Sequence, residues 1–115
     1  MSNPFGDVFH LTHSVSIYVP STTDVNKAAN NAQWVDKVQS TLSQLFGGNT
    51  AHNASGAWMS PDFGLVREDV VICQSFADDL TEDALQTVYD LAALVKSGMS
   101  QEAVSVEIDG TLYLV

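Results

Sequence analysis

The chain is poor in cysteine and in basic residues, and it has no long apolar run. Its single cysteine, Cys73, excludes an internal disulfide. No stretch approaches the roughly 18 consecutive apolar residues of a membrane-spanning helix. The first residues lack the basic and apolar regions of a signal peptide. We therefore expect a cytoplasmic protein, in the cell that encodes it or in a host cell.

Basic residues are so scarce that the charge is strongly one-sided. Four lysine and arginine residues stand against fourteen acidic residues, which gives a net charge of −10. Eleven of the acids lie in residues 61–115, with only two basic residues beside them. A field of this sign repels nucleic acid and anionic membranes, so we expect direct binding to neither. This excess of negative charge is expected either of a protein that binds a basic partner or of one with a solvated acidic surface, as in adaptation to high salt.

The composition indicates one folded domain. Of the 115 residues, 45% are hydrophobic and 16% are charged, a balance typical of globular chains. Pro4 and Gly6 disfavour regular structure near the start. We predict a flexible arm over residues 1–8 and a single domain over residues 9–115.

The spacing of apolar residues predicts strands and helices in a definite order. Alternation over residues 9–19 indicates a strand that Pro20 ends, followed by a polar loop over residues 21–30. Helical spacing predicts a helix over residues 31–46, capped by Asn30 or Asn31 and stopped by Gly47. The remaining predictions are strands at 50–59 and 65–76, a helix at 82–97 and a final hairpin over 103–115.

The second predicted helix has signals at both ends. Thr81 is placed to cap its start, and Gly98 is placed to end it. The order is then β-α-β-β-α-β with a short extra strand. The simplest arrangement is an α+β, ferredoxin-like βαββαβ sandwich, in which two helices cover one face of an antiparallel sheet and the first and third strands are central. We expect one shared core formed by Val15, Ile17, Val38, Leu42, Leu45, Ile72, Val88, Ala92 and Val106.

The register of the final hairpin decides where two leucines lie. A two-residue Asp109-Gly110 loop pairs Ile108 with Thr111 and leaves Leu112 and Leu114 on the sheet face away from the helices. A three-residue loop with a bulge would instead place them in the core. Asp-Gly favours the first register. We therefore predict a homodimer whose interface includes Tyr18, Leu112 and Leu114.

Acidic residues gather at the start of the second helix. Asp78, Asp79, Glu82 and Asp83 lie within six positions. Their carboxylates can stabilise the helix dipole, or alternatively they can form a docking site for a basic partner.

Three chemical signatures, a metal site, a reactive cysteine and a phosphate-binding loop, are weak or absent. His10 and His13 are spaced like metal ligands, but residues three apart on a strand point to opposite faces, so we predict no metal site and assign His13 to the core. Cys73 lies in an apolar run, where a thiol is inert. The sequence also lacks a phosphate-binding loop, so we expect no cofactor and no catalytic set.

A second group of residues lies on the two middle strands. Phe46-Gly47-Gly48-Asn49-Thr50, then Gly56-Ala57-Trp58, then Glu68-Asp69 resembles a pattern in small uncharacterised ferredoxin-like proteins of bacteria and mobile elements. The resemblance implies a ferredoxin-like fold and an origin in a mobile element, and it implies no activity. The residues themselves leave two interpretations open. In the first, Trp58 is a core aromatic residue and Glu68 is a solvated strand residue. In the second, Trp58 packs over the sheet edge and Glu68 on the paired strand accepts a hydrogen bond nearby, so that the two mark a possible cleft.

These observations support three functional hypotheses. The first is a non-enzymatic acidic protein that binds a basic protein surface through Asp78, Asp79, Glu82 and Asp83, as a phage or mobile-element inhibitor of a nucleic-acid-binding host defence protein. The second is a ferredoxin-like homodimer that binds a small molecule on its open sheet face. The third is a small dimeric enzyme with Trp58, Glu68 and a histidine in a cleft between protomers. The sequence favours the first of these.

Overall fold

The fold is an antiparallel sheet covered on one face by two helices. A computed structural model describes residues 3–24, 27–28 and 30–115. The elements, in chain order, are β1 (His13–Pro20), β2 (Thr22–Asp24), β3 (Lys27–Ala28), α1 (Ala32–Phe46), β4 (Thr50–Ser60), β5 (Gly64–Ala77), α2 (Glu82–Gly98), β6 (Ser105–Ile108) and β7 (Thr111–Leu114). Five of the strands form one sheet in the order β4-β5-β1-β6-β7, and β2 and β3 pair separately.

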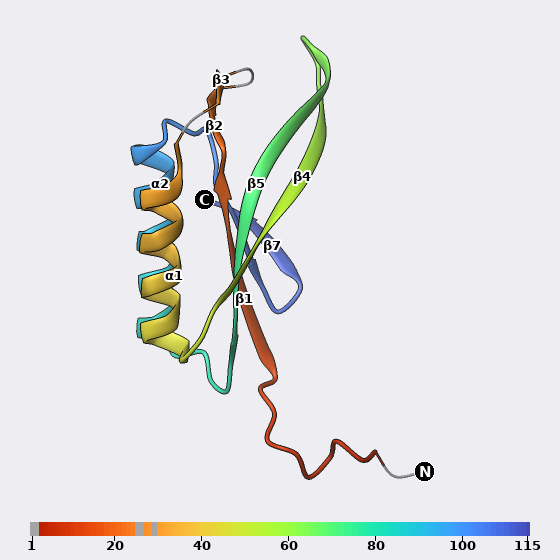
Figure 1. Ribbon diagram of the computed structural model, residues 1–115, viewed down its shortest axis with the longest axis vertical. Helices are drawn as coiled ribbons and strands as arrows, with labels where there is room; N and C mark the ends of the chain where they lie inside the picture. Colours follow the sequence, from red (N-terminus) through yellow and green to blue (C-terminus); the bar gives the residue numbers. More distant parts are fainter. Residues whose placement is uncertain (1–2, 25–26, 29) are drawn as a thin grey trace.

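The strand order confirms the predicted α+β architecture. β1 lies between β5 and β6, and all pairings in the sheet are antiparallel. Figure 1 shows α1 and α2 side by side over one face of the sheet, with the other face left uncovered. We call this uncovered side the open face. Within the described ranges, neither helix combines the length and hydrophobicity that a membrane-spanning helix requires.

The core lies between the helices and the central strands. Val15, Ile17 and Val19 of β1 are fully buried, as their alternation predicts. Of the nine residues predicted to share the core, seven are buried there, and Leu45 packs at its edge. Ile72 was assigned wrongly. It lies directly opposite Tyr18 on the open face, and its neighbour Cys73 occupies the core position.

β1 is shorter at its start than the sequence pattern predicts. The alternation begins at Phe9, but pairing begins at His13, which lies opposite Ala77, the last residue of β5. The predicted strand over residues 9–12 is therefore wrong for this chain alone, because no neighbouring strand extends that far. Pro20 is the last residue of β1, as expected of a residue that cannot donate to the ladder. The predicted polar loop contains the short hairpin β2–β3, and residues 25, 26 and 29 of that prediction lie outside the described ones.

The ends of α1 use both asparagines and a glycine. Asn31 is the N-cap residue, but its side chain donates to the Pro20 carbonyl at 3.0 Å instead of capping. The Asn30 side chain accepts the hydrogen bond from the Ala32 N–H at 3.1 Å. At the other end, Gly47 adopts φ 95° and donates its N–H to the Ser43 carbonyl, which confirms the predicted helix stop.

α2 ends at Gly98, as predicted, but Gly98 is still helical and does not adopt the left-handed conformation of a glycine stop. It faces α1. A Cβ atom built at Gly98 would lie 2.1 Å from Cζ2 of the Trp34 indole, far inside van der Waals contact. The glycine is therefore required for the close approach of the two helices. The predicted cap at the start of α2 is confirmed, since the Ala84 N–H donates to Oγ1 of Thr81 at 3.1 Å.

The final hairpin has the predicted two-residue loop. Ile108 pairs with Thr111, and Asp109 and Gly110 adopt φ values of 52° and 86°, as a type I′ turn requires. Glu107 pairs with Leu112 and Ser105 pairs with Leu114. Leu112 and Leu114 therefore lie on the open face, where their side chains are 55% and 70% exposed.

Candidate functional site

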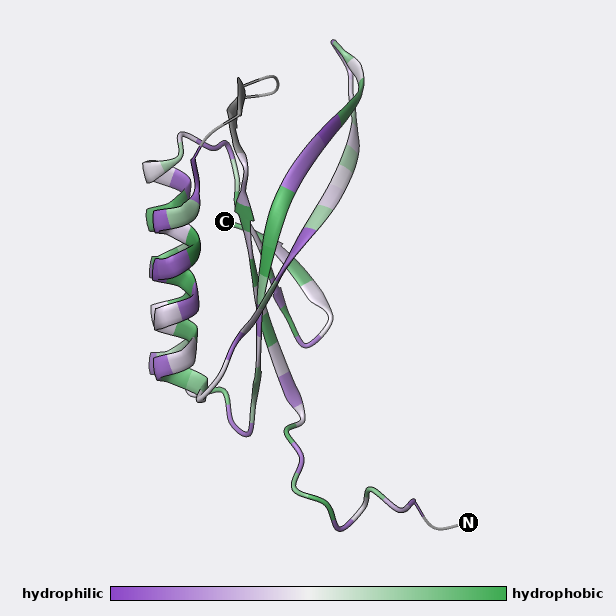
Figure 2. Cartoon of the chain, viewed as in Figure 1, coloured by the Kyte–Doolittle hydropathy of each residue, from purple (hydrophilic) through white to green (hydrophobic). Residues whose placement is uncertain are grey.

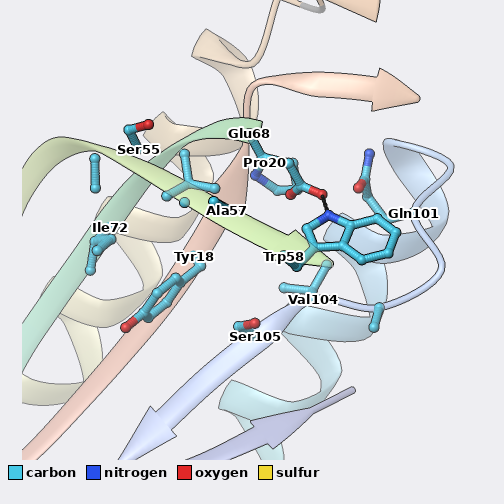
Figure 3. Close-up of a pocket in the computed structure, with 14 residues that line it drawn as sticks. Tyr18, Pro20, Ser55, Ala57, Trp58, Glu68, Ile72, Gln101, Val104 and Ser105 are labelled. Atoms are coloured by element: carbon cyan, nitrogen blue, oxygen red, sulfur yellow. Dashed lines mark hydrogen bonds between the residues drawn. The ribbon is translucent and has the colours of Figure 1, made fainter. Parts of the chain in front are cut away.

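A cavity of about 270 Å³ lies on the open face where four strands meet the segment that follows α2. We call it the sheet-face cavity (Figure 3). Its walls come from β1, β4, β5 and β6 together with Gln101 and Ala103. The side chains that could make polar contacts with a ligand are Tyr18, Ser55, Trp58, Glu68, Gln101 and Ser105. Among the lining residues that the structure describes there is no lysine, arginine or histidine, so the cavity is suited to a neutral or cationic ligand.

Trp58 and Glu68 meet across the β4–β5 ladder. Trp58 lies opposite Val66, and Gly56 lies opposite Glu68, so the indole and the carboxylate are diagonal neighbours on one face. The Trp58 Nε1–H donates to Oε1 of Glu68 at 2.7 Å, as Figure 3 shows. Gly56 has no side chain, which leaves the space between the two groups open. Of the two sequence-based interpretations, the structure favours the one in which Glu68 accepts a hydrogen bond near Trp58, and Trp58 is not a core residue.

Apolar groups form the floor of the sheet-face cavity. Pro20, Val70 and Ile72 come from the paired strands β1 and β5, and Val104 closes the side next to β6. Such a floor favours a ligand with an apolar or aromatic part, and the indole adds a flat face for stacking or for contact with a cation. The carboxylate supplies one fixed negative charge. The arrangement can therefore bind an organic cation that has a planar group.

Gln101 is a cavity residue that the sequence analysis missed. It follows α2 in an irregular segment, where its backbone N–H donates to the Lys96 carbonyl at 2.9 Å and its Nε2 donates to the Met99 carbonyl at 3.1 Å. Figure 3 shows its side chain beside the Trp58 ring. No periodic pattern marks this segment, so only the packing of α2 against the sheet brings Gln101 to the cavity.

The predicted acidic cluster lies far from the cavity. Glu68 is nine residues before the end of β5, a distance of about 30 Å along a strand, and Asp78 and Asp79 follow that end. Glu82 and Asp83 occupy the first turn of α2, where carboxylates stabilise the helix dipole. The structure thus gives two of these acids a local structural role.

The predicted interface residues all lie on the open face. Tyr18 is partly buried and lines the sheet-face cavity, whereas Leu112 and Leu114 are exposed on β7. Their part in a dimer remains a prediction, as does the use of Trp58 and Glu68 by a ligand.

The two histidines singled out in the sequence do not share a site. His13 Nδ1 lies 2.7 Å from Oδ2 of Asp109, and His10 Nδ1 lies 2.8 Å from the Val8 carbonyl. His13 therefore joins the start of β1 to the hairpin turn, and it is not a core residue as predicted. Its side chain and the Ser14 N–H lower the pKa of the Asp109 carboxyl. In the part of the chain that the structure describes, no three metal-ligating side chains gather.

Cys73 lies on β5, opposite Ile17 of β1, and is buried in the core. Its side chain has no exposed surface, and burial raises the pKa of its thiol to about 11. The thiol therefore stays protonated at neutral pH and is a poor nucleophile.

Two solved structures share this fold over almost the whole chain. A phage SAM lyase in complex with S-methyl-5′-thioadenosine is 19% identical, with a TM-score of 0.68, and the match covers 94% of this chain and 94% of that chain. A phage SAM lyase in the apo state is 15% identical, with a TM-score of 0.65, over 100% of this chain and 94% of that chain. No protein-family model and no curated protein matches the chain. Similarity at these identities shows the fold.

The comparison corrects the hypothesis that the sequence favoured. The prediction of a non-enzymatic inhibitor that binds a basic protein through Asp78, Asp79, Glu82 and Asp83 was wrong, because the two structures that share this fold are of an enzyme, and one of them has a small molecule bound. The similarity to a phage protein agrees with the resemblance to mobile-element proteins only in that both point to proteins of mobile elements. A small-molecule site on the open face agrees better with these findings.

Proposed function

We propose that this chain is an enzyme that binds S-adenosylmethionine in the sheet-face cavity and cleaves it without water, releasing S-methyl-5′-thioadenosine. The observation that carries the proposal is the pairing of Trp58 with Glu68 in a cavity whose described lining residues include no basic side chain. The fold shared with a SAM lyase supports the choice of substrate. The net charge of −10 also favours approach of a cationic substrate.

The proposed reaction balances without an added proton or a water molecule. The carboxylate of the substrate attacks its own Cγ and closes a five-membered lactone ring. The bond between Cγ and the sulfonium sulfur breaks, and its electron pair stays on sulfur as a neutral thioether. The products are S-methyl-5′-thioadenosine and a lactone that keeps the α-ammonium group. The protein therefore has to bind and orient the substrate, since the substrate supplies the nucleophile.

Charge changes during this reaction indicate where Glu68 acts. The sulfonium loses its positive charge in the transition state, so a carboxylate beside it would stabilise the substrate more than the transition state. The ammonium keeps its charge throughout. We therefore assign Glu68 to the ammonium and the apolar floor formed by Val70 and Ile72 to the sulfonium. A floor of this kind offers little solvation to the sulfonium and so favours loss of its charge.

Trp58 is a positioning residue in this scheme. Its Nε1–H holds one oxygen of Glu68, and its ring lies at the cavity wall near Gln101 (Figure 3). The ring face suits stacking against the adenine base, and the Gln101 amide suits hydrogen bonding to the base or the ribose.

We propose that a second copy of the chain completes the site. A single chain encloses about 270 Å³, just below the ~300–1,000 Å³ typical of small-molecule sites. Leu112 and Leu114 lie exposed on the same open face. A copy packed against this face would cover the leucines and deepen the cavity.

The direct test is incubation of the purified protein with S-adenosylmethionine, followed by mass spectrometry of the products. We expect S-methyl-5′-thioadenosine and the lactone. In ¹⁸O-labelled water the γ-oxygen of the four-carbon product should stay unlabelled, whereas attack by water on Cγ would label it. S-adenosylhomocysteine, which lacks the sulfonium, should not be cleaved.

The role of Glu68 is tested by an isosteric variant. Glu68→Gln keeps an oxygen for the Trp58 hydrogen bond but removes the charge, so kcat/KM should fall roughly tenfold to a hundredfold, mainly through a higher KM, as expected for loss of a hydrogen bond between charged groups. Glu102→Gln is the matched control, because Glu102 is exposed and does not line the cavity. Equal activity of the two variants would remove Glu68 from the mechanism, and absence of both products with wild-type protein would refute the proposed activity.

A further inference from the structure

The segment of residues 3–12, which we call the N-terminal segment, carries apolar side chains in water. Phe5, Val8 and Phe9 are exposed, and the Phe9 side chain is 84% exposed. Figure 1 shows the segment running from β1 away from the sheet and helices, and Figure 2 shows hydrophobic stretches along it. Apolar groups displayed together in this way mark a surface that another element covers.

The same segment has the pattern of a strand but no strand partner. Phe9, Leu11 and His13 continue the alternation of β1. Residues 9–12 pair with no strand in the ranges that the structure describes, because β5 ends opposite His13. The turn of the β6–β7 hairpin also ends there, with the Ser14 N–H donating to Asp109 at 3.0 Å. The sequence therefore encodes a strand that this chain's own sheet does not accommodate.

An apolar groove of about 450 Å³ lies between α2 and β7. We call it the α2–β7 groove. Leu85 and Tyr89 form one wall, Tyr113 and Val115 form the other, and no charged residue lines it. β7 is also an edge strand of the sheet, with one side free for pairing and no charged residue in its four positions. An uncharged edge of this kind accepts a further strand.

The N-terminal segment cannot simply fold back onto its own β7. β7 begins beside Asp109, next to the start of β1, so the segment would have to reverse direction between Phe9 and His13. Residues 10–12 contain no glycine, proline, asparagine or aspartate to make such a turn. The segment of a second copy meets no such constraint.

We propose that the N-terminal segment of one copy adds as a strand to β7 of a second copy and places Phe9 in the α2–β7 groove. The charges of the two surfaces suit this contact. Each chain carries a net charge of −10, yet Asp7 is the only acid in the segment and the groove has none. Reciprocal exchange about a two-fold axis would give a closed dimer. This contact is separate from the sheet-face cavity and does not depend on the proposed reaction.

Cross-linking tests the proposed partner directly. Phe9→Cys and Tyr113→Cys are made in two versions of the chain that differ in length, mixed, and treated with a short bis-maleimide. The native Cys73 is buried and protonated, so it does not compete. We expect a covalent product that contains one long and one short chain. Phe63→Cys is the control for Phe9→Cys: Phe63 is 73% exposed at the tip of the β4–β5 hairpin, and it should not cross-link to Tyr113→Cys.

Association is measured on single variants by sedimentation velocity. Phe9→Ser should raise the dissociation constant at least tenfold, whereas Phe63→Ser should leave it unchanged. Three results would each overturn the proposal: cross-linking of Phe9→Cys only to itself, a product within one chain of a Phe9→Cys, Tyr113→Cys double variant at low concentration, or equal dissociation constants for both serine variants.

Discussion

The hydrogen bond between Trp58 and Glu68 follows from strand geometry. The two residues are ten apart in sequence, yet the β4–β5 register makes them diagonal neighbours, and the bare Gly56 between them lets the indole reach the carboxylate. Because the partners lie on adjacent strands joined by a short turn, their proximity is visible in the sequence.

Replacing Trp58 by phenylalanine tests whether this hydrogen bond positions Glu68. The variant keeps an aromatic face but loses the Nε1–H donor. We expect kcat/KM for S-adenosylmethionine cleavage to fall about tenfold, mainly through a higher KM, because a partly exposed hydrogen bond to a charged group contributes on the order of 1–2 kcal/mol. Thermal stability should be nearly unchanged. Phe63→Leu, at the exposed tip of the β4–β5 hairpin, is the control; equal kcat/KM values for both variants would contradict a positioning role.

Asp109 links pH to the stability of the β6–β7 turn. Its pKa lies below the usual value because it accepts hydrogen bonds from His13 and from the Ser14 N–H. A carboxyl with a lowered folded-state pKa stabilises the fold above its unfolded pKa of about 3.9, and that stabilisation is lost as the pH falls through the folded pKa.

The variant Asp109→Asn should show this dependence. Asparagine tolerates the positive φ of 52°, so the turn is retained while the charge is lost. In urea unfolding we expect the variant to be less stable than wild type at pH 7, with the difference shrinking below about pH 4. Asp62→Asn, at the exposed tip of the β4–β5 hairpin, should show no such trend. A difference that stays constant with pH would contradict the argument.

The contact between α1 and α2 depends on Gly98. Alanine has a higher helix propensity by about 1 kcal/mol, so Gly98→Ala would stabilise an isolated helix. Here the added Cβ meets the Trp34 ring, and we expect a net loss of about 1–3 kcal/mol in the free energy of unfolding. Chemical denaturation measures this change in the free energy of unfolding. Ser97→Ala should cost little, and Trp34→Leu should remove most of the penalty. A stabilised Gly98→Ala variant would show that the helices are not packed so closely.

Local pattern predicts most elements of this fold but not all of their limits. The helices, β1, β4, β5 and the two-residue hairpin are each encoded by spacing within a short window. The start of β1 is set instead by where β5 ends, opposite His13. The packing role of Gly98 was missed because a glycine at a helix end can serve as a stop, as a packing site or as both, and only the position of Trp34 reveals the packing.

The candidate site was only half predictable for a related reason. Trp58 and Glu68 lie on strands whose pairing can be inferred, whereas Gln101 and Tyr18 reach the cavity through the packing of distant segments. The acidic cluster was given a functional interpretation because net charge can be obtained from the sequence. A cavity is not evident from the sequence, so the small-molecule hypothesis was ranked too low.

Association through the open face should respond to salt and to Leu112. Two chains with a net charge of −10 repel each other, so added salt should tighten the proposed dimer. Burying a leucine contributes roughly 1.5–3 kcal/mol, and a two-fold dimer buries Leu112 twice. Leu112→Ser should therefore raise the dissociation constant at least tenfold in sedimentation equilibrium.

The matched control for Leu112→Ser is Leu94→Ser, since Leu94 is an exposed leucine of α2, away from the sheet. If the second copy completes the sheet-face cavity, the specific activity of Leu112→Ser should also fall as the protein is diluted. An unchanged dissociation constant, or activity independent of concentration, would place the association surface elsewhere.

The place of β1 in the sheet also fixes when the chain can fold during its synthesis. β1 is made first, but its two neighbours end at Ala77 and Ile108. At about 5–20 residues per second, roughly 4–18 s separate the synthesis of Pro20 and Ile108. During that time α1 and the β4–β5 hairpin can form, while one edge of β1 still has no neighbour. The nascent chain therefore completes its sheet only near the end of translation, and in that interval its apolar strand is open to chaperones and to misfolding.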